Sequence, residues 1–498
     1  DGRGGVAVET GVVGYVPVDY ATAYYNRTTP DWELKYPTHN AASDGWSGWW
    51  PDPIAPTNVC ELAANETGAV WINFKTDGGT APGVYRGRIV WREAGRIVRT
   101  DDYAVMVWNF ALPAVAEIPA VYDLRMGARW ADDVKGLSAD ERRRLFLKFY
   151  SEKRICPDSV NASVRFARDA EGRVTADFAE YDRLATEYFE EFKFPVSYTP
   201  GTFYCFGWGM PPKAFLGEEP YEGKWPFEGA DRSQLRPAYR KAYQDALRLY
   251  WNHVKAKGWD KKIVLYISDE PHFSVKAVKD QMIALCRMIH EVDPAIRVYS
   301  STWRHCPEWN DSLDVWGVGH YGAFPVAEMK ARAAAGKHIW FTTDGQMCLD
   351  TPYCAVERLL PHYSIAYDAE AYEFWGATWL TYDPWQYGWH SYIRQSDTPG
   401  KFYSVRYPDG DGYLMYPGVP GRFKGPVSSV RLEAARDGVE DFSYLKALRR
   451  LAASADGRAA RAKALLADFA ALVTIPNPGG RYSSRILPEP ERLRRTSP

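Results

Sequence analysis

From residue 118 to about residue 380, the sequence alternates short apolar runs with amphipathic segments, and this rhythm constrains the fold more than any other feature. Such alternation is typical of a parallel sheet in which a helix follows each strand. The helical patterns include residues 138–153, 236–258 and 274–292, with Ser274 as the expected N-cap of the last. The candidate strands are residues 119–126, 153–160, 194–200, 262–270, 296–303, 314–321, 337–345 and 373–380. Eight strands over about 260 residues predict a (β/α)8 barrel of the TIM type.

The segments before and after the barrel have different patterns of predicted strands and helices. Residues 1–115 show short strand patterns between turn signals, which predict an antiparallel β-sandwich domain. We assign residues 116–425 to the barrel as the catalytic domain. Residues 426–498 predict a short helical extension and a tail that pack on the barrel.

One stretch of the N-terminal domain stands out by its composition. Residues 43–56, "SDGWSGWWPDPIAP", are rich in Trp and Pro, and we expect them to form an irregular loop rather than regular structure. Two roles suit such a loop: a lid or seam between domains, which we favour, or a contact with a sugar.

Composition narrows the class of ligand. The formal net charge of -2 leaves no basic excess to neutralise phosphates, so we expect no nucleic-acid partner. Aromatic residues make up 15% of the chain, with 20 Trp, and flat aromatic rings suit the apolar faces of sugars as well as core packing. The balance favours a glycan or glycoconjugate as the substrate.

The sequence shows no motif for a metal site or a cofactor site, and no membrane span. The seven Cys form no Cys-x-x-Cys pair, the nine His show no ligand spacing, and no Gly-rich phosphate loop follows a strand, so we expect neither metal nor cofactor. No apolar run approaches the roughly 20 residues of a membrane span. Because the sequence begins at Asp1 rather than Met, we expect an exported protein, periplasmic or extracellular.

Two adjacent carboxylates, Asp269 and Glu270, end the fourth candidate strand in "YISDEPH". In a barrel, the C-terminal ends of the strands line the active site. Adjacent side chains of a regular strand point to opposite faces, so both acids reach one ligand only if the strand twists or bulges there. Repulsion by an ionised Asp269 favours a protonated Glu270, which would suit a general acid. The structural alternative is an Asp that caps the next helix beside a solvated Glu.

The same positional rule gives further candidates at the ends of the other strands. Together they suit a pocket that hydrogen-bonds hydroxyl groups and stacks a ring. These candidates are Asp123, Arg125, Asp158, Tyr204, Trp303, His320, Tyr321, Asp344, Trp379, Tyr382, Asp383 and Trp385.

Three stretches resemble a known family. "DGYLMYPG" followed by "PVSSVRLEAARDGVEDFSYL", at 411–445, is similar to the signature of glycoside hydrolase family 123 and its relatives with domain of unknown function 4091. "YISDEPH" resembles the catalytic Asp-Glu pair of that family. The N-terminal strands, with "WWPDPIAP" and "APGVYRGRI", resemble its β-sandwich domain.

The resemblance implies a retaining exo-acting β-N-acetylgalactosaminidase with substrate-assisted catalysis. In that mechanism the 2-acetamido oxygen of the substrate is the nucleophile. Glu270 would protonate the leaving oxygen and later activate water. Asp269 would orient the acetamido N–H and stabilise the oxazolinium intermediate.

Alternatives remain beside this interpretation. A two-carboxylate retaining glycosidase would use Glu270 as acid/base and Asp344 as nucleophile. A non-catalytic glycan-binding barrel is the second alternative, because a fold does not establish an activity. Within the signature, the charged residues have helical spacing, which predicts a network of salt bridges and caps rather than a site. These residues are Arg431, Glu433, Arg436, Asp437, Glu440 and Asp441.

Overall fold

The protein is described from a computed structural model. The described residues are 5–18, 48–125, 136–302, 304–319, 324–343, 349–350, 355–379, 384–387, 409–410, 412, 414–419 and 422–472.

Eight parallel strands of the described chain form a nearly closed ring, which confirms the predicted barrel. The eighth strand pairs with the first, and a parallel bridge between Ser159 and Tyr198 lies between the second and the third. In chain order the strands are β6 (Ala120–Tyr122), β7 (Cys156–Pro157), β10 (Ser197–Tyr198), β12 (Ile263–Asp269), β13 (Val298–Thr302), β14 (Val315–Val318), β15 (His338–Thr343) and β16 (Ala371–Phe374).

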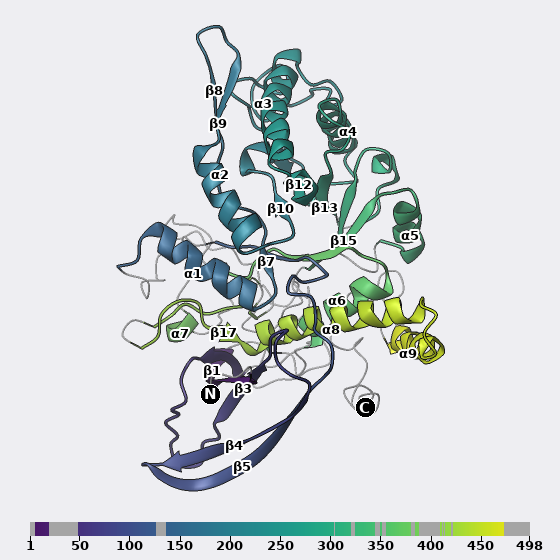
Figure 1. Cartoon of the computed structure of the whole chain (residues 1–498). Coiled ribbons are helices and arrows are strands. Elements are labelled where there is room, and N and C mark those ends of the chain that lie inside the picture. The colour runs from purple at the N-terminus through teal and green to yellow at the C-terminus, as the bar shows by residue number, and fades with distance from the viewer. Residues whose placement is uncertain are drawn as a thin grey trace.

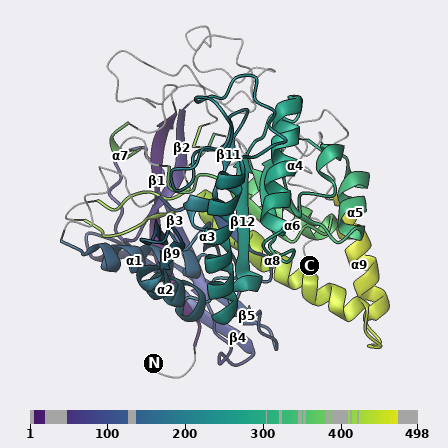
Figure 2. The ribbon, with the colours of Figure 1, turned by 90° about the horizontal axis from the view of Figure 1, so that it is seen from above.

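Helices surround these strands, as Figure 2 shows around β12. Their apolar faces are buried, as the amphipathic patterns predict. The helices are α1 (Ala139–Glu152), α2 (Ala179–Thr186) continued by the π-helical η3 (Glu187–Glu191), α3 (Pro237–Ala256), α4 (Lys276–His290), α5 (Val326–Ala334) and α6 (Ala355–Ala366).

Shorter elements connect them. These are the hairpin of β8 (Arg165–Arg168) and β9 (Val174–Asp177), the strand β11 (Phe206–Gly207), the 3-10 turns η4 (Gly201–Phe203), η5 (Asp260–Lys262) and η6 (Pro307–Trp309), and the short helix α7 (Pro384–Tyr387).

Two predicted boundaries are wrong. Ser274 is not the N-cap of α4, because Val275 occupies that position and makes no side-chain cap. The eighth strand covers Ala371–Phe374 rather than residues 373–380. It ends early because the chain turns at Gly376, where an added Cβ would lie 2.5 Å from the Cα of Gly412.

Aromatic side chains fill the inside of the barrel. The ring centroid of Tyr299 lies 5.3 Å from that of Tyr198, 5.0 Å from that of Tyr266 and 5.2 Å from that of Trp340. A Cβ at Gly317 would approach the Tyr299 hydroxyl to 2.4 Å, so the glycine makes room for this ring. The barrel is therefore a packed core that supports the ends of its strands.

Antiparallel strands make up the N-terminal part, as predicted. β1 (Ala7–Val18) pairs with β2 (Gly48–Ala55) and β3 (Ala69–Lys75), while β4 (Gly83–Glu93) and β5 (Arg96–Val107) form a hairpin. The two-residue β17 (Ser428–Ser429), which precedes the C-terminal helices, adds to β2.

The expectation of an irregular loop at residues 43–56 is wrong for its second part, because residues 48–55 are the strand β2. Prolines are tolerated there because they fall where the ladder is weak. Pro51 faces a bulge of β1 between Val13 and Tyr15, and Pro53 faces the short β17. Residues 43–47 lie outside the described residues.

The helix α8 (Val430–Ala452), followed by α9 (Ala459–Leu472), lies between the barrel and the N-terminal strands (Figure 1). The guanidinium of Arg431 donates to both carboxylate oxygens of Asp52, at 3.1 and 2.9 Å, and Tyr416 donates to the same carboxylate at 2.7 Å. Lys153 and Ser428 bind Glu433 beside them. We call these residues the seam. They confirm the salt-bridge network predicted in the signature. The role of the Trp-rich stretch stays a prediction.

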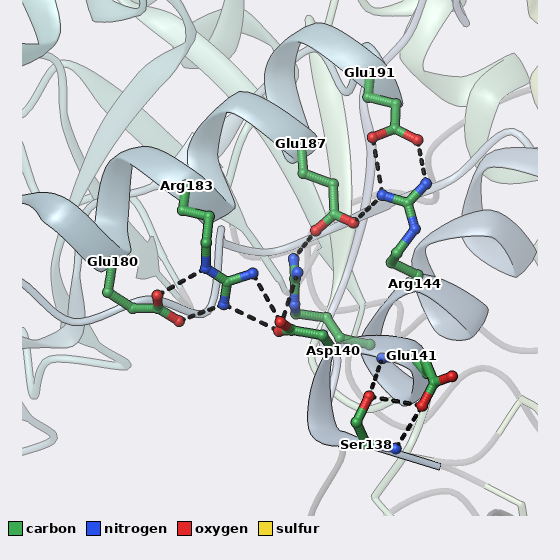
Figure 3. A network of polar contacts seen from close by, with 9 residues as sticks. Ser138, Asp140, Glu141, Arg144, Glu180, Arg183, Glu187 and Glu191 are labelled. Carbon is green, nitrogen blue, oxygen red and sulfur yellow. Dashed lines mark hydrogen bonds and ion pairs between the residues drawn. The ribbon is translucent and has the colours of Figure 1, made fainter.

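A second network, in which Glu187 is buried and most other side chains are exposed, joins α1 to α2 and η3 (Figure 3). Ser138 and Glu141 form a capping box at the start of α1. Arg183 bridges Glu180 and Asp140, and Arg144 binds two glutamates of η3, Glu187 and Glu191. This network fixes the angle between neighbouring barrel helices.

Candidate active site

Asp269 and Glu270 stand together at the C-terminal end of β12. The pairing of β12 with β13 shifts register between Tyr266 and Ser268. Glu270 then adopts a φ of 41°, in the left-handed region that non-glycine residues rarely occupy. The bulge and the left-handed residue break the alternation of a regular strand, which is the condition for two adjacent acids to address one ligand.

Two hydroxyl groups hold Asp269. Its Oδ1 accepts hydrogen bonds from Tyr266 at 2.9 Å and from Ser301 at 2.7 Å. The Ser301 hydroxyl also accepts the main-chain N–H of Glu270 at 3.2 Å, so one side chain of β13 supports both acids. Hydroxyl donors orient a carboxylate without neutralising its charge, so Asp269 is suited to face a developing positive charge.

The indole of Trp208 holds Glu270. Its Nε1–H donates to Glu270 Oε2 at 3.1 Å, from a turn 62 residues earlier in the chain. Trp208 itself has a φ of 52°, so two strained residues meet at this contact. The rule of strand ends did not predict a role for Trp208. Its place between two glycines in "FGWGM" nevertheless indicates an unusual turn.

Tyr204 lies beside the pair, as its predicted role requires. Its ring packs edge-on against that of Tyr266, with centroids 5.5 Å apart. Burial, and then the charge of Asp269, raise the pKa of the Tyr204 phenol, which therefore remains a neutral hydrogen-bonding group. An added Cβ at Gly207 would lie 2.9 Å from the Tyr204 hydroxyl, so this glycine leaves room for the phenol.

A third carboxyl group, Glu373 of β16, lies inside the barrel and was also missed. It accepts hydrogen bonds from Thr342 and, at 3.2 Å, from Tyr299. Burial raises the pKa of Glu373 to about 7; the Thr342 hydrogen bond opposes this rise and the charge of Asp269 adds to it. Because the predicted strand began at residue 373, the sequence did not place this acid inside the barrel.

Asp123, Arg125 and Asp158 gather at the ends of β6 and β7. Arg125 Nε lies 2.5 Å from Asp123 Oδ2, and the Arg125 main-chain N–H donates to the Thr378 hydroxyl at 2.6 Å. Burial raises the pKa of both aspartates, and the charge of Asp158 adds to the rise at Asp123. These strand ends belong to the same side of the barrel as Asp269, so the cluster can contribute to the same rim.

Of the other predicted residues, two belong to the described part of the chain. Trp379 and Trp385 pack against a small cluster that includes Val16 and Tyr416, beside the N-terminal sheet. They follow the early end of β16, so the chain has already left the strand before it reaches them. Trp303, His320, Tyr321, Asp344, Tyr382 and Asp383 lie outside the described residues.

The described residues contain no group of three or more His, Cys, Asp or Glu side chains arranged to hold a metal ion. None of the described helices is long and apolar enough to span a membrane.

Comparison with known proteins identifies a family over more than half of the chain. Residues 150–448 match the model of the glycoside hydrolase 123 catalytic domain. No curated protein matches the sequence.

Two solved structures are similar to this chain. A family 123 glycoside hydrolase from Clostridium perfringens, described for glycolipid glycan hydrolysis, has 14% identity and a TM-score of 0.61, covering 96% of this chain and 81% of that chain. A family 39 glycoside hydrolase from Bacteroides cellulosilyticus WH2 is more distant, with 12% identity and a TM-score of 0.36, covering 89% of this chain and 78% of that chain. The first likeness supports a barrel preceded by antiparallel sheets.

Proposed function

Because the chain belongs to glycoside hydrolase family 123, we propose that this glycoside hydrolase releases terminal β-linked N-acetylgalactosamine from glycans with retention of configuration. The observation that carries the proposal is the pair of adjacent carboxylates with different supports. Asp269 is held by two hydroxyls and Glu270 by an indole N–H. One strand end therefore supplies an oriented anion and a separately held acid.

Glu270 performs the proton transfers in this proposal. As an acid it protonates the glycosidic oxygen while the bond to the sugar breaks. As a base it then takes a proton from the water that attacks the intermediate. The Trp208 hydrogen bond holds its carboxyl group toward the leaving group through both steps.

Asp269 acts on the nucleophile. Because both hydroxyls donate to Oδ1, we assign Oδ2 to the acetamido N–H of the substrate. This contact aligns the acetamido oxygen with the anomeric carbon, and the anion stabilises the positive charge of the cyclised intermediate. Adjacent acids on one strand end suit this division better than a nucleophile and an acid on opposite sides of a sugar.

The sugar hydroxyls are bound by the other groups of the rim. Asp123 and Arg125, which follow β6, present an ion pair with one half-exposed partner, and such pairs hydrogen-bond vicinal hydroxyls well. Tyr204 adds a neutral phenol beside Asp269.

Release of N-acetylgalactosamine from its methyl β-glycoside, whose leaving oxygen needs a proton, tests the proposal. We expect Glu270→Gln to lower kcat/KM by about 10²- to 10⁴-fold, because general acid–base catalysis contributes this much. Asp269→Asn should lower kcat by a comparable factor. Glu152→Gln, a half-exposed acid of α1, is the control and should retain wild-type activity. Full activity of Glu270→Gln would refute the proposal.

An inhibitor separates the mechanisms. A thiazoline mimic of the cyclised intermediate should inhibit the enzyme competitively, and Asp269→Asn should weaken its binding. A fluorosugar that forms a stable ester on Asp344 would instead support the two-carboxylate mechanism.

A further inference from the structure

We propose that Trp208 forms the leaving-group subsite, where its exposed ring stacks on the sugar beyond the scissile bond while its N–H positions Glu270. The inference rests on the proposed function, since it assigns the part of the glycan that lies beyond the terminal sugar. It begins from the turn of residues 207–210, which follows β11.

The main chain of Trp208 is tied directly to the catalytic strand end. Its N–H donates to the carbonyl oxygen of Asp269 at 2.8 Å, and its carbonyl oxygen accepts the N–H of His272 at 3.1 Å. Both peptide groups of Trp208 are therefore bound to the segment that carries the acids. The turn and the segment that carries the acids are therefore expected to move together.

The rest of the turn is bound by other elements. Arg232 donates to the carbonyl oxygen of Gly209 at 2.9 Å, and Gln281 of α4 donates to that of Met210 at 3.0 Å. Gln281 is fully buried, so its amide is committed to this contact. The turn is a rigid support rather than a loose loop, and rigid supports suit positioned groups.

The residue at position 208 is not what the backbone alone would select. A φ of 52° costs a tryptophan conformational energy that a glycine would not incur, and glycines stand on both sides. The side chain must therefore serve a purpose that glycine cannot.

That purpose is not core packing, because 54% of the Trp208 surface is exposed. By contrast, Trp251, Trp259, Trp309 and Trp316 are each at most 3% exposed. The 3.1 Å hydrogen bond turns the indole edge toward Glu270, so the ring lies beside the carboxyl group that protonates the leaving oxygen. Met210, 42% exposed in the same turn, extends the apolar surface. A flat apolar face at that place fits the C–H face of a sugar ring.

Three β-N-acetylgalactosaminides separate the two effects of Trp208. A disaccharide with galactose as the leaving group offers a ring and needs protonation. The methyl glycoside needs protonation but offers no ring, and the 4-nitrophenyl glycoside offers a ring but leaves without a proton. The control variant is Trp225→Ala, since Trp225 is 48% exposed in another loop and packs on Phe227.

We expect Trp208→Ala to lower kcat/KM for the disaccharide about tenfold more than for the methyl glycoside, because only the disaccharide loses a stacking partner. Trp208→Phe keeps a ring, so the KM for the disaccharide should stay near wild type. It lacks the N–H, so its kcat should fall for all three substrates, and most for the disaccharide and the methyl glycoside, whose leaving oxygens need a proton. Trp225→Ala should behave as wild type on all three.

The outcomes distinguish the two proposals. A wild-type enzyme that cleaves none of the three glycosides would refute the proposed function and this inference with it. A wild-type enzyme that cleaves them, with equal losses for disaccharide and methyl glycoside in Trp208→Ala, would refute the subsite alone. Wild-type kcat values in Trp208→Phe would refute the positioning of Glu270.

Discussion

The seam and the C-terminal end of the barrel, which we call the mouth, both hold acidic side chains. The partners of these acids differ between the two regions. In the seam, Asp52 is bound by the guanidinium of Arg431, and Glu433 by the ammonium of Lys153. At the mouth and just inside it, Asp269 and Glu373 are bound by hydroxyls of Tyr266, Ser301, Thr342 and Tyr299. The seam pairs each of these two acids with a cation, whereas Asp269 and Glu373 accept hydrogen bonds from neutral hydroxyl groups.

The proton affinities follow from this contrast. Burial alone would raise the pKa of Glu433, but Lys153 and Arg436 bring it below its ordinary value. Burial raises the pKa of Glu373 to about 7. Cations favour the charged form of an acid in the seam, whereas burial among hydroxyl groups lets Glu373 keep its proton to a higher pH. The strongest sequence fingerprint lies in the seam, and the proposed chemistry lies at the end of β12.

The largest effect on stability should come from the seam. Arg431→Met leaves Asp52 buried without its cation, so we expect the free energy of unfolding to fall by about 3–5 kcal/mol. Urea unfolding measures this change. The control is Arg88→Met, whose partner Asp102 is exposed on β4–β5, and it should change little. Equal effects of the two variants would contradict the role of the seam.

A change of intermediate size should come from the mouth and depend on pH. The folded protein keeps a proton on Glu373 up to a pKa of about 7, while the unfolded chain releases it near 4.5. Stability should therefore decrease as pH rises through this window, by about 3 kcal/mol from this group. Glu373→Gln cannot release a proton and should lose this part of the decrease. Unfolding curves at both ends of the window compare the two proteins, and parallel pH profiles would count against a raised pKa of Glu373.

The smallest effect should come from the exposed part of the second network, in α1 and α2 (Figure 3). Arg183→Met removes ion pairs with Asp140 and Glu180, whose side chains are all about half exposed. Solvent screens such pairs, so the Tm should stay within about 2 °C of wild type. Thermal unfolding followed by circular dichroism measures it. A fall as large as that of Arg431→Met would show that burial does not decide the strength of these networks.

Features that depend on local pattern could be predicted from the amino-acid sequence. The alternation of strands and helices predicted the barrel, and the end of β12 placed Asp269 and Glu270 at its rim. Helical spacing in the signature predicted a salt-bridge network. These inferences succeeded because strand ends and helix faces repeat with known periods.

The partners of these acidic side chains depend on the folded chain and could not be predicted from the sequence. Trp208 meets Glu270 across 62 residues, and Arg431 meets Asp52 across 379. The helical or strand periodicity of the sequence predicts neither contact. A bulge in β12 and two left-handed residues set the directions of Trp208 and Glu270. The pairing of β17 with β2 brings Arg431 close to Asp52. Pattern locates an acid on its strand, but the folded chain decides whether a cation, a hydroxyl or an indole faces it, and so whether it stabilises the fold or carries the chemistry.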